Sequence, residues 1–226
     1  MMSIDDDCRR LLALLTHEMR SPGAVVAGYL RMLKGPSTSD LPSREQKMIE
    51  EANRSCARMM HIVQELSDFR ELVDNGKELQ RVPLPIFTLC EEVVQKCCEE
   101  GSDVSLVVDD GDRETTMVDG HDVRLRQAIG ALIASIVRER AAGAVEARGF
   151  VNRNGSAIAL ITFAEPGTIQ SVSEVLRHRD LPFDQWRGGM GLALPIAQQI
   201  VDAHHGRLWA MPGSRATCAL SLPLSM

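Results

Sequence analysis

The chain has 226 residues, of which 44% are hydrophobic and 25% charged. This suits one large folded domain or two small ones, and it excludes wholesale disorder and collagen-like structure. Lys and Arg total 25 against 31 Asp and Glu, a net charge of −6. That balance argues against nucleic acid as a partner, because phosphate binding depends on clustered positive charge.

Two long helical segments are predicted first. Apolar residues recur every three and four positions over residues 5–33 and again over residues 43–74. The first stripe contains Leu12, Leu15, Met19, Pro22, Val26, Tyr29 and Leu33, and the second Ile49, Ala52, Cys56, Met59, Val63 and Leu66. The Gly- and Pro-containing run 35–42 cannot continue a helix, so an antiparallel hairpin is expected. Since two helices bury too little surface, we expect a homodimer that completes a four-helix bundle.

Strand and helix patterns alternate beyond a boundary near residues 75–83. We expect a hairpin domain over residues 1–78 and a second domain over 79–226. The second should contain helices at 86–100, 122–140 and 192–204, and strands at 104–108, 115–118, 145–151, 156–163, 207–211 and 217–222. The fold class is therefore α+β: the hairpin precedes an α/β sandwich, whose mixed or antiparallel sheet carries helices on one face.

His17 is the first candidate for chemistry. It lies two positions from both Leu15 and Met19, about 200° around the helix, so it should point away from the hairpin partner and into solvent. Glu18 follows directly, Arg20 lies three positions after His17, and Pro22 can bend the helix. This set suits phosphoryl transfer, with imidazole as nucleophile, the carboxylate as orienting group or proton acceptor, and the cation offsetting charge. The alternative interpretation is a surface histidine beside an accidental proline.

The segment Leu15–Pro22 resembles the phosphoacceptor box of the histidine kinases of two-component signalling. The hairpin is similar to their dimerisation domain, and residues 80–226 follow the order of elements in their Bergerat-type ATP-binding domain. The resemblance implies that His17 is phosphorylated and that Glu18 is its acid/base neighbour. It also implies that Ser21 stands where relatives carry the Thr or Asn that orients a dephosphorylating water. Gly23 departs from the leucine usual in the family.

The nucleotide motifs of that family are present only in part. Residues 188–196 resemble its second glycine box, although Ala193 occupies a usual glycine position, and a glycine-rich turn that opens a packed helix is the alternative interpretation. If nucleotide binds, the resemblance implies contacts from Gly189, Gly191, Leu192 and Arg138. Residues 181–186 resemble the phenylalanine box, yet almost no residues separate them from Gly188, so the nucleotide lid is missing.

In two further motifs, apolar or small residues stand where the family has polar residues that bind nucleotide. Residues 124–135 resemble the asparagine-box helix, but Ala131 and Ser135 stand where the family has its two asparagines. Phe163 aligns with the aspartate that accepts from the adenine amino group. Loss of such a buried acceptor leaves the ligand's polar group unpaired, at a cost of about 1 to 3 kcal/mol. The sequence therefore predicts a degenerate ATP site.

These observations favour a histidine phosphotransferase that passes phosphoryl groups between response-regulator aspartates through His17. The first alternative is the ATP-dependent catalytic core of a sensor histidine kinase, and the second is a non-enzymatic dimeric adaptor that binds receiver domains. We expect no cofactor, with Mg-ATP only under the kinase alternative, and response-regulator receiver domains as partners. The six cysteines form no C-x-x-C pair, so no metal site is expected. No apolar run reaches the roughly 20 residues that span a bilayer, and the start of the chain is acidic. We therefore expect no membrane segment and a cytoplasmic location.

Overall fold

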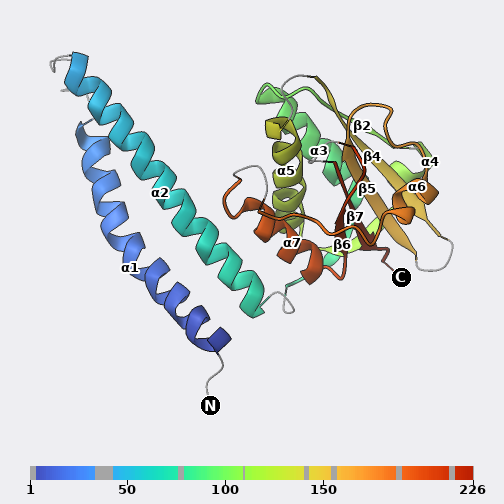
Figure 1. Cartoon of the computed structure of the whole chain (residues 1–226), viewed down its shortest axis with the longest axis horizontal. Coiled ribbons are helices and arrows are strands. Elements are labelled where there is room, and N and C mark those ends of the chain that lie inside the picture. Colours follow the sequence, from blue (N-terminus) through green and yellow to red (C-terminus); the bar gives the residue numbers. More distant parts are fainter. Residues whose placement is uncertain are drawn as a thin grey trace. The chain divides into compact units, whose positions relative to one another are not determined.

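The computed structural model describes residues 4–33, 43–75, 79–108, 110–139, 143–153, 157–186, 190–213 and 217–225. The chain divides into two compact units, Met1–Asp74 and Asn75–Met226 (Figure 1). The first unit is helical, and the second combines helices with a sheet. The predicted α+β class is thereby confirmed.

The first unit is a hairpin of α1 (Ile4–Leu33) and α2 (Ser43–Asn75). Contacts between Arg20 and Gln64 and between Gly23 and Cys56 show that the helices run antiparallel, as predicted. The face of α1 that packs on α2 is not the predicted stripe: Thr16 and Gly23 are buried, whereas other apolar residues remain exposed, namely Met19, Val26, Tyr29 and Leu33. The apolar spacing predicted the helix correctly, but these stripe residues form a surface that α2 does not cover.

A five-stranded mixed sheet organises the second unit. Its order is β2 (Val104–Val107), β4 (Val145–Asn152), β5 (Ile158–Ala164), β7 (Cys218–Pro223) and β6 (Arg207–Ala210). Strands β2 and β4 are parallel, and the remaining pairs are antiparallel. A separate two-stranded sheet pairs β1 (Val82–Pro85) with β3 (Met117–Gly120).

In the described part of this unit the helices are α3 (Ile86–Glu99), α4 (Asp110–Arg113), α5 (Asp122–Glu139), α6 (Val172–Arg177) and α7 (Ala193–Ala203). The elements predicted from periodicity are present within a few residues, but β1, α4 and α6 were missed. Strand β1 contains Pro83 and Pro85, which argue against a strand in sequence, and α4 and α6 are shorter than two helical turns. The strand predicted from residue 115 starts at Met117, because the hydroxyls of Thr115 and Thr116 bond back to carbonyls of α4.

The sheet carries side chains on both of its faces. Gly149 faces α3, since a Cβ there would lie 2.6 Å from the Phe87 ring, and its register partner Ile161 is fully buried on the same side. Leu160 points to the opposite face, where it packs in one cluster with Val175 of α6. The expectation that helices cover one face only was therefore wrong: α3, α5 and α7 form the main layer, and α6 covers part of the outer face (Figure 1).

His204 ties the end of α7 to the loop before α5. Its side chain is almost fully buried, its Nδ1 lies 2.7 Å from the Ile200 carbonyl oxygen, and its Nε2 accepts the His121 backbone N–H at 2.9 Å. Both contacts are satisfied by a neutral ring that carries its proton on Nδ1. Burial lowers the pKa of His204, and the positive charge of Arg81 lowers it further. The hydrogen bond to the Ile200 carbonyl acts in the opposite direction and is outweighed.

This arrangement predicts a loss of stability in acid. Unfolded His204 binds a proton near its usual pKa of about 6.5 more readily than the folded residue does, so unfolding takes up a proton below that pH. The free energy of unfolding should therefore fall by up to about 1.4 kcal/mol per pH unit as pH drops below about 6.5. Urea denaturation at several pH values should show a shallower slope for His204→Gln. His205→Gln, at the exposed neighbouring histidine, is the control. If this variant reduces the pH dependence of the unfolding free energy as much as His204→Gln does, His204 is not the group responsible.

Candidate functional site

The segment predicted to be the phosphoacceptor box, Leu15–Pro22, lies in the middle of α1. The helix runs without a break through His17, Glu18 and Pro22. Because Pro22 has no N–H, the Glu18 carbonyl loses its helical donor next to the histidine. The side chains of His17 and Glu18 lie outside the described part of the structure, so their predicted orientation and pairing remain predictions.

Arg20 and Ser21 are exposed on this part of α1. Arg20 Nη2 donates to Gln64 Oε1 of α2 at 3.4 Å, and Gln64 Nε2 donates to Asp68 Oδ1 at 3.0 Å. The cation that follows the predicted nucleophile is thus held across the hairpin by a chain of polar contacts. Sequence reasoning missed Gln64 and Asp68; their four-residue spacing shows that they share a face of α2, but only the packing shows that this face meets Arg20.

Gly23 permits close packing of the hairpin beside this segment. A Cβ at Gly23 would lie 2.3 Å from Met60 Sδ of α2, and the Cys56 thiol donates to the Gly23 carbonyl oxygen at 3.7 Å. A leucine there, as in the resembling family, would require Met60 to move. The departure from the family pattern is therefore matched by the packing of α2.

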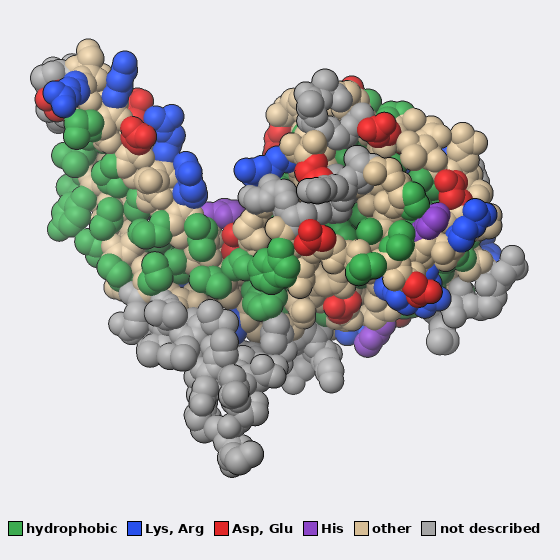
Figure 2. All heavy atoms as spheres, viewed as in Figure 1, with side chains coloured by type: hydrophobic (Ala, Val, Ile, Leu, Met, Phe, Trp, Pro, Cys, Tyr) green, Lys and Arg blue, Asp and Glu red, His purple; other side chains and the backbone are tan. Residues whose placement is uncertain are grey.

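The hairpin exposes an apolar surface larger than isolated residues would give. Figure 2 shows hydrophobic side chains along the left side of the hairpin. The exposed large residues are Met19, Val25, Val26, Tyr29, Met32 and Leu33 of α1 and Met48, Met59 and Ile62 of α2. Contiguous exposed apolar surface of this kind is typical of interaction sites.

In the second unit, α5 presents the positions that the resemblance assigned to nucleotide. Arg124, Ala131, Ser135 and Arg138 fall within about 60° of one another around the helix at 100° per residue. Ser135 is fully buried and has no amide with which to hold a metal ion, and Arg138 is exposed in the last turn. A cavity of about 420 Å³ between α3 and α5 lies on a different stripe, which includes Val123, Gly130 and Ile133.

The start of α7 offers few phosphate donors. Gly191 has a left-handed φ of 62°, and Leu192 caps the helix without a side-chain bond. Of the N–H groups in this first turn, that of Ala193 is bonded to the Met190 carbonyl, and Pro195 has none. Leu192 and Leu194 are left as possible backbone donors. Gly189 lies outside the described residues.

Phe163 stands at the position that the resemblance assigns to the adenine-binding aspartate. It lies in β5 opposite Ala147 and Cys218, and its ring is fully buried. An apolar ring at this depth cannot accept a hydrogen bond from adenine. In the alignment that the resemblance implies, Ala131, Ser135 and Phe163 provide no carboxylate or amide side chain for Mg-ATP, so a degenerate nucleotide site stays a prediction.

The Cys90 side chain of α3 is fully buried. Burial raises the pKa of the Cys90 thiol to about 12, so this cysteine stays protonated at neutral pH. Within the described ranges, no group of three or more His, Cys, Asp or Glu side chains could hold a metal ion. In the same ranges, no helix combines the length and apolar character needed to cross a bilayer.

Known proteins resemble both units. Residues 9–73 match the family model of the His Kinase A (phospho-acceptor) domain. The chain is 23% identical over 225 residues to the adaptive-response sensory kinase SasA of Synechocystis sp., covering 95% of this chain and 59% of SasA. It is 24% identical over 202 residues to the sensor protein kinase PmrB of Pseudomonas aeruginosa, covering 88% of this chain and 42% of PmrB. The chain thus spans less than two thirds of these curated relatives.

Solved structures agree on the fold. Full-length ShkA, crystallised with AMPPNP, superposes with a TM-score of 0.70 at 21% identity, covering 96% of this chain and 46% of ShkA. The histidine kinase AdeS of Acinetobacter baumannii gives a TM-score of 0.54 at 19% identity, covering 93% of this chain and 98% of AdeS. These likenesses show a shared fold, and the match to the phospho-acceptor domain model covers residues 9–73 of the first unit.

Proposed function

We propose that this chain is a histidine phosphotransferase whose His17 carries phosphoryl groups between response-regulator aspartates. The observation that supports it most is a contrast between the two units. The phosphoacceptor box lies in a helix matched by the phospho-acceptor domain family, while Ala131, Ser135 and Phe163 occupy positions where nucleotide needs polar ligands. A receiver domain brings the phosphoryl group already activated, so this reaction requires no bound ATP.

The chemistry balances with the groups of α1. An unprotonated imidazole nitrogen of His17 forms a P–N bond while the P–O bond to the receiver aspartate breaks, and the aspartate leaves as a carboxylate. The proton on the other ring nitrogen passes to Glu18 or to solvent. Arg20, held by Gln64, offsets the charge of the phosphoryl group. Transfer to a second aspartate is the reverse of these steps.

Transfer from a phosphorylated receiver tests the proposal. Incubation with a panel of response regulators labelled at the aspartyl phosphate should move label onto this chain as an acid-labile, base-stable adduct. A phosphoramidate has this stability profile, whereas an acyl phosphate does not survive base. If no regulator in a broad panel donates label, the phosphotransferase proposal is wrong.

The kinase alternative is supported by the relatives SasA and PmrB, which are a sensory kinase and a sensor kinase. The two proposals differ in nucleotide affinity. Calorimetry with Mg-ATP should show no binding at micromolar concentrations, because the replaced acceptors on α5 and β5 leave polar groups of the ligand unpaired. Low-micromolar binding, followed by transfer of the γ-phosphate to the protein, would establish the kinase activity instead.

The exposed apolar surface of the hairpin predicts a homodimer. Sedimentation at micromolar concentration should give twice the monomer mass of 24.9 kDa, because a second hairpin would cover Val26, Tyr29 and their neighbours. Tyr29→Glu should shift the protein towards monomer, since it places a charge in that surface. Lys47→Glu, a charge reversal at an exposed polar position of α2, is the matched control and should leave the dimer intact. A compact monomer for the unmodified chain would contradict the prediction.

A further inference from the structure

The cover on the outer face of the sheet ends near β2. Ala164 and Leu160 of β5, Ala219 of β7 and Trp209 of β6 are buried there together with Val175 of α6. Beyond this apolar cluster the same face carries the buried Glu146, the partly buried Arg148 and the exposed Val107. A cavity of about 270 Å³ lies where the cover ends, and its lining includes Val107, Arg148, Phe150, Gln170 and Val172.

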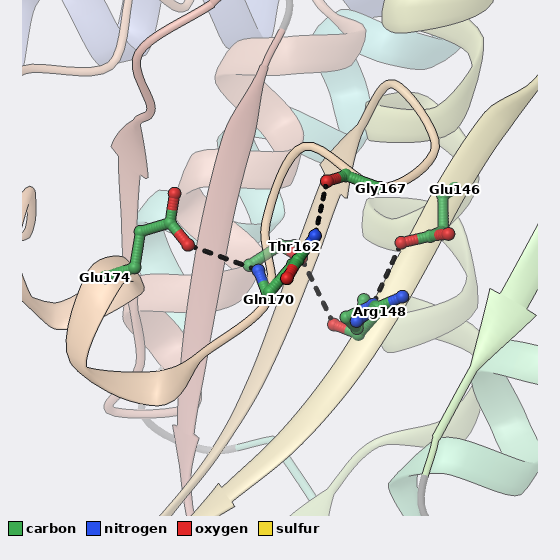
Figure 3. Close-up of polar contacts among 6 residues, drawn as sticks. All are labelled: Glu146, Arg148, Thr162, Gly167, Gln170 and Glu174. Atoms are coloured by element: carbon green, nitrogen blue, oxygen red, sulfur yellow. Dashed lines mark hydrogen bonds and ion pairs between the residues drawn. The ribbon is translucent and has the colours of Figure 1, made fainter.

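Arg148 provides the charge in this cavity. Its Nε donates to Glu146 Oε1 at 2.9 Å, and the two side chains are only 23% and 11% exposed. Opposite in register, the Thr162 hydroxyl donates to the Arg148 carbonyl oxygen at 3.3 Å and fixes the strand at this point (Figure 3). Neither Nη group has an acceptor among the described residues, and neither is sealed from solvent. The bond from Nε to Glu146 therefore fixes the guanidinium and leaves the N–H groups of both Nη atoms available to a ligand.

The loop between β5 and α6, residues 165–171, contributes Gln170 to the cavity lining. The Gln170 backbone N–H donates to Glu174 Oε2 at 3.2 Å, and its Nε2 donates to the Gly167 carbonyl oxygen at 3.2 Å (Figure 3). These two bonds hold Gln170 in the cavity lining. Phe150 and Val172 pack against the outer-face cluster and give the cavity apolar walls. The site thus combines one fixed cationic edge with an apolar body.

Charge and size together define the ligand. The two Nη groups of an arginine match the two oxygens of a carboxylate, which they bind in a bidentate manner. Because Glu146 already balances the guanidinium, a doubly charged phosphate would be repelled more strongly than a singly charged acid. The cavity is smaller than the roughly 300 to 1,000 Å³ typical of sites for drug-sized ligands. We propose that this cavity binds a small monocarboxylic acid with a short apolar body, independently of phosphoryl transfer.

Titration of the full chain with N-acetyl-leucine tests the proposal, with N-acetyl-leucinamide as the uncharged match. Ligand-observed NMR should detect millimolar binding of the acid and about tenfold weaker binding of the amide, because the amide cannot form the bidentate ion pair. Arg148→Gln should weaken binding of the acid about tenfold. Should that variant fail to fold, Arg148→Lys keeps the charge without the planar fork and should also lose affinity.

Two further variants separate this site from nonspecific attraction. Glu146→Gln should bind the acid several times more tightly, because it removes the competing carboxylate from Arg148. Arg153→Gln changes an exposed arginine just after β4 that pairs with Asp112, and it should bind like the unmodified chain. Equal affinity for acid and amide, or unchanged binding in the Arg148 variants, overturns the proposal. The proposal is also overturned if the cavity does not bind the free acid and binds only a carboxylate on the surface of a folded protein.

Discussion

His17→Ala is expected to abolish transfer of label from a phosphorylated receiver to this chain. The substitution removes the nucleophile of the proposed reaction, so the adduct should fall to background, a loss of about a hundredfold or more. The dimer should persist, because the sequence predicts a solvent-facing position for this residue and such substitutions change stability little. Quantitative autoradiography after a fixed incubation, with sedimentation of the same sample, measures both outcomes.

Two variants show whether the loss is specific to His17. Glu18→Gln should slow transfer without abolishing it, since the carboxylate of Glu18 only assists the nucleophile. His178→Gln, at the end of α6 in the other unit, should transfer at the unmodified rate. Label that survives His17→Ala across a fair panel of regulators identifies a different acceptor residue.

Gly206→Ala is expected to destabilise the second unit by about 3 kcal/mol. A Cβ at this position would lie 2.3 Å from the Ser221 carbonyl oxygen, which is backbone of β7 and cannot move aside as a side chain could. It would also crowd Val201 and Leu222 at 2.9 Å. The turn has little room to adjust, because His205 already has a left-handed φ of 57° and the Gly206 N–H is bonded to Val201. Thermal and urea unfolding measure the loss.

Gly111→Ala provides the matched control within the same unit. No atom lies within 4 Å of the Cβ that it would add, and the residue belongs to the short helix α4. Alanine favours helix over glycine, so stability should change by less than about 1 kcal/mol and not in the destabilising direction. A Gly206→Ala protein that unfolds like this control would show that β6 and β7 tolerate the added atom.

The sequence predicted the elements whose pattern is long and regular. Heptad spacing identified α1 and α2, and the alternation of strand and helix patterns beyond residue 79 identified the main sheet and α3, α5 and α7. The segment Leu15–Pro22 could be recognised as similar to a phosphoacceptor box because its residues are contiguous and lie within about two turns of one helix, and its role stays a prediction. Short elements such as α6, and β1 with its two prolines, carry too few residues to show a period.

The tertiary structure decided which surfaces meet. An apolar stripe on α1 does not say whether it packs on α2, and the close approach of Gly23 to Met60 shows that a different face of α1 does so. The link from Arg20 to Gln64 joins residues 44 positions apart, and the cavity at Arg148 depends on where the loop after β5 stops covering the sheet. Local periodicity follows from the geometry of a single helix or strand, so the sequence determines it directly. Contacts between distant segments depend on packing of the whole chain, which leaves no local pattern.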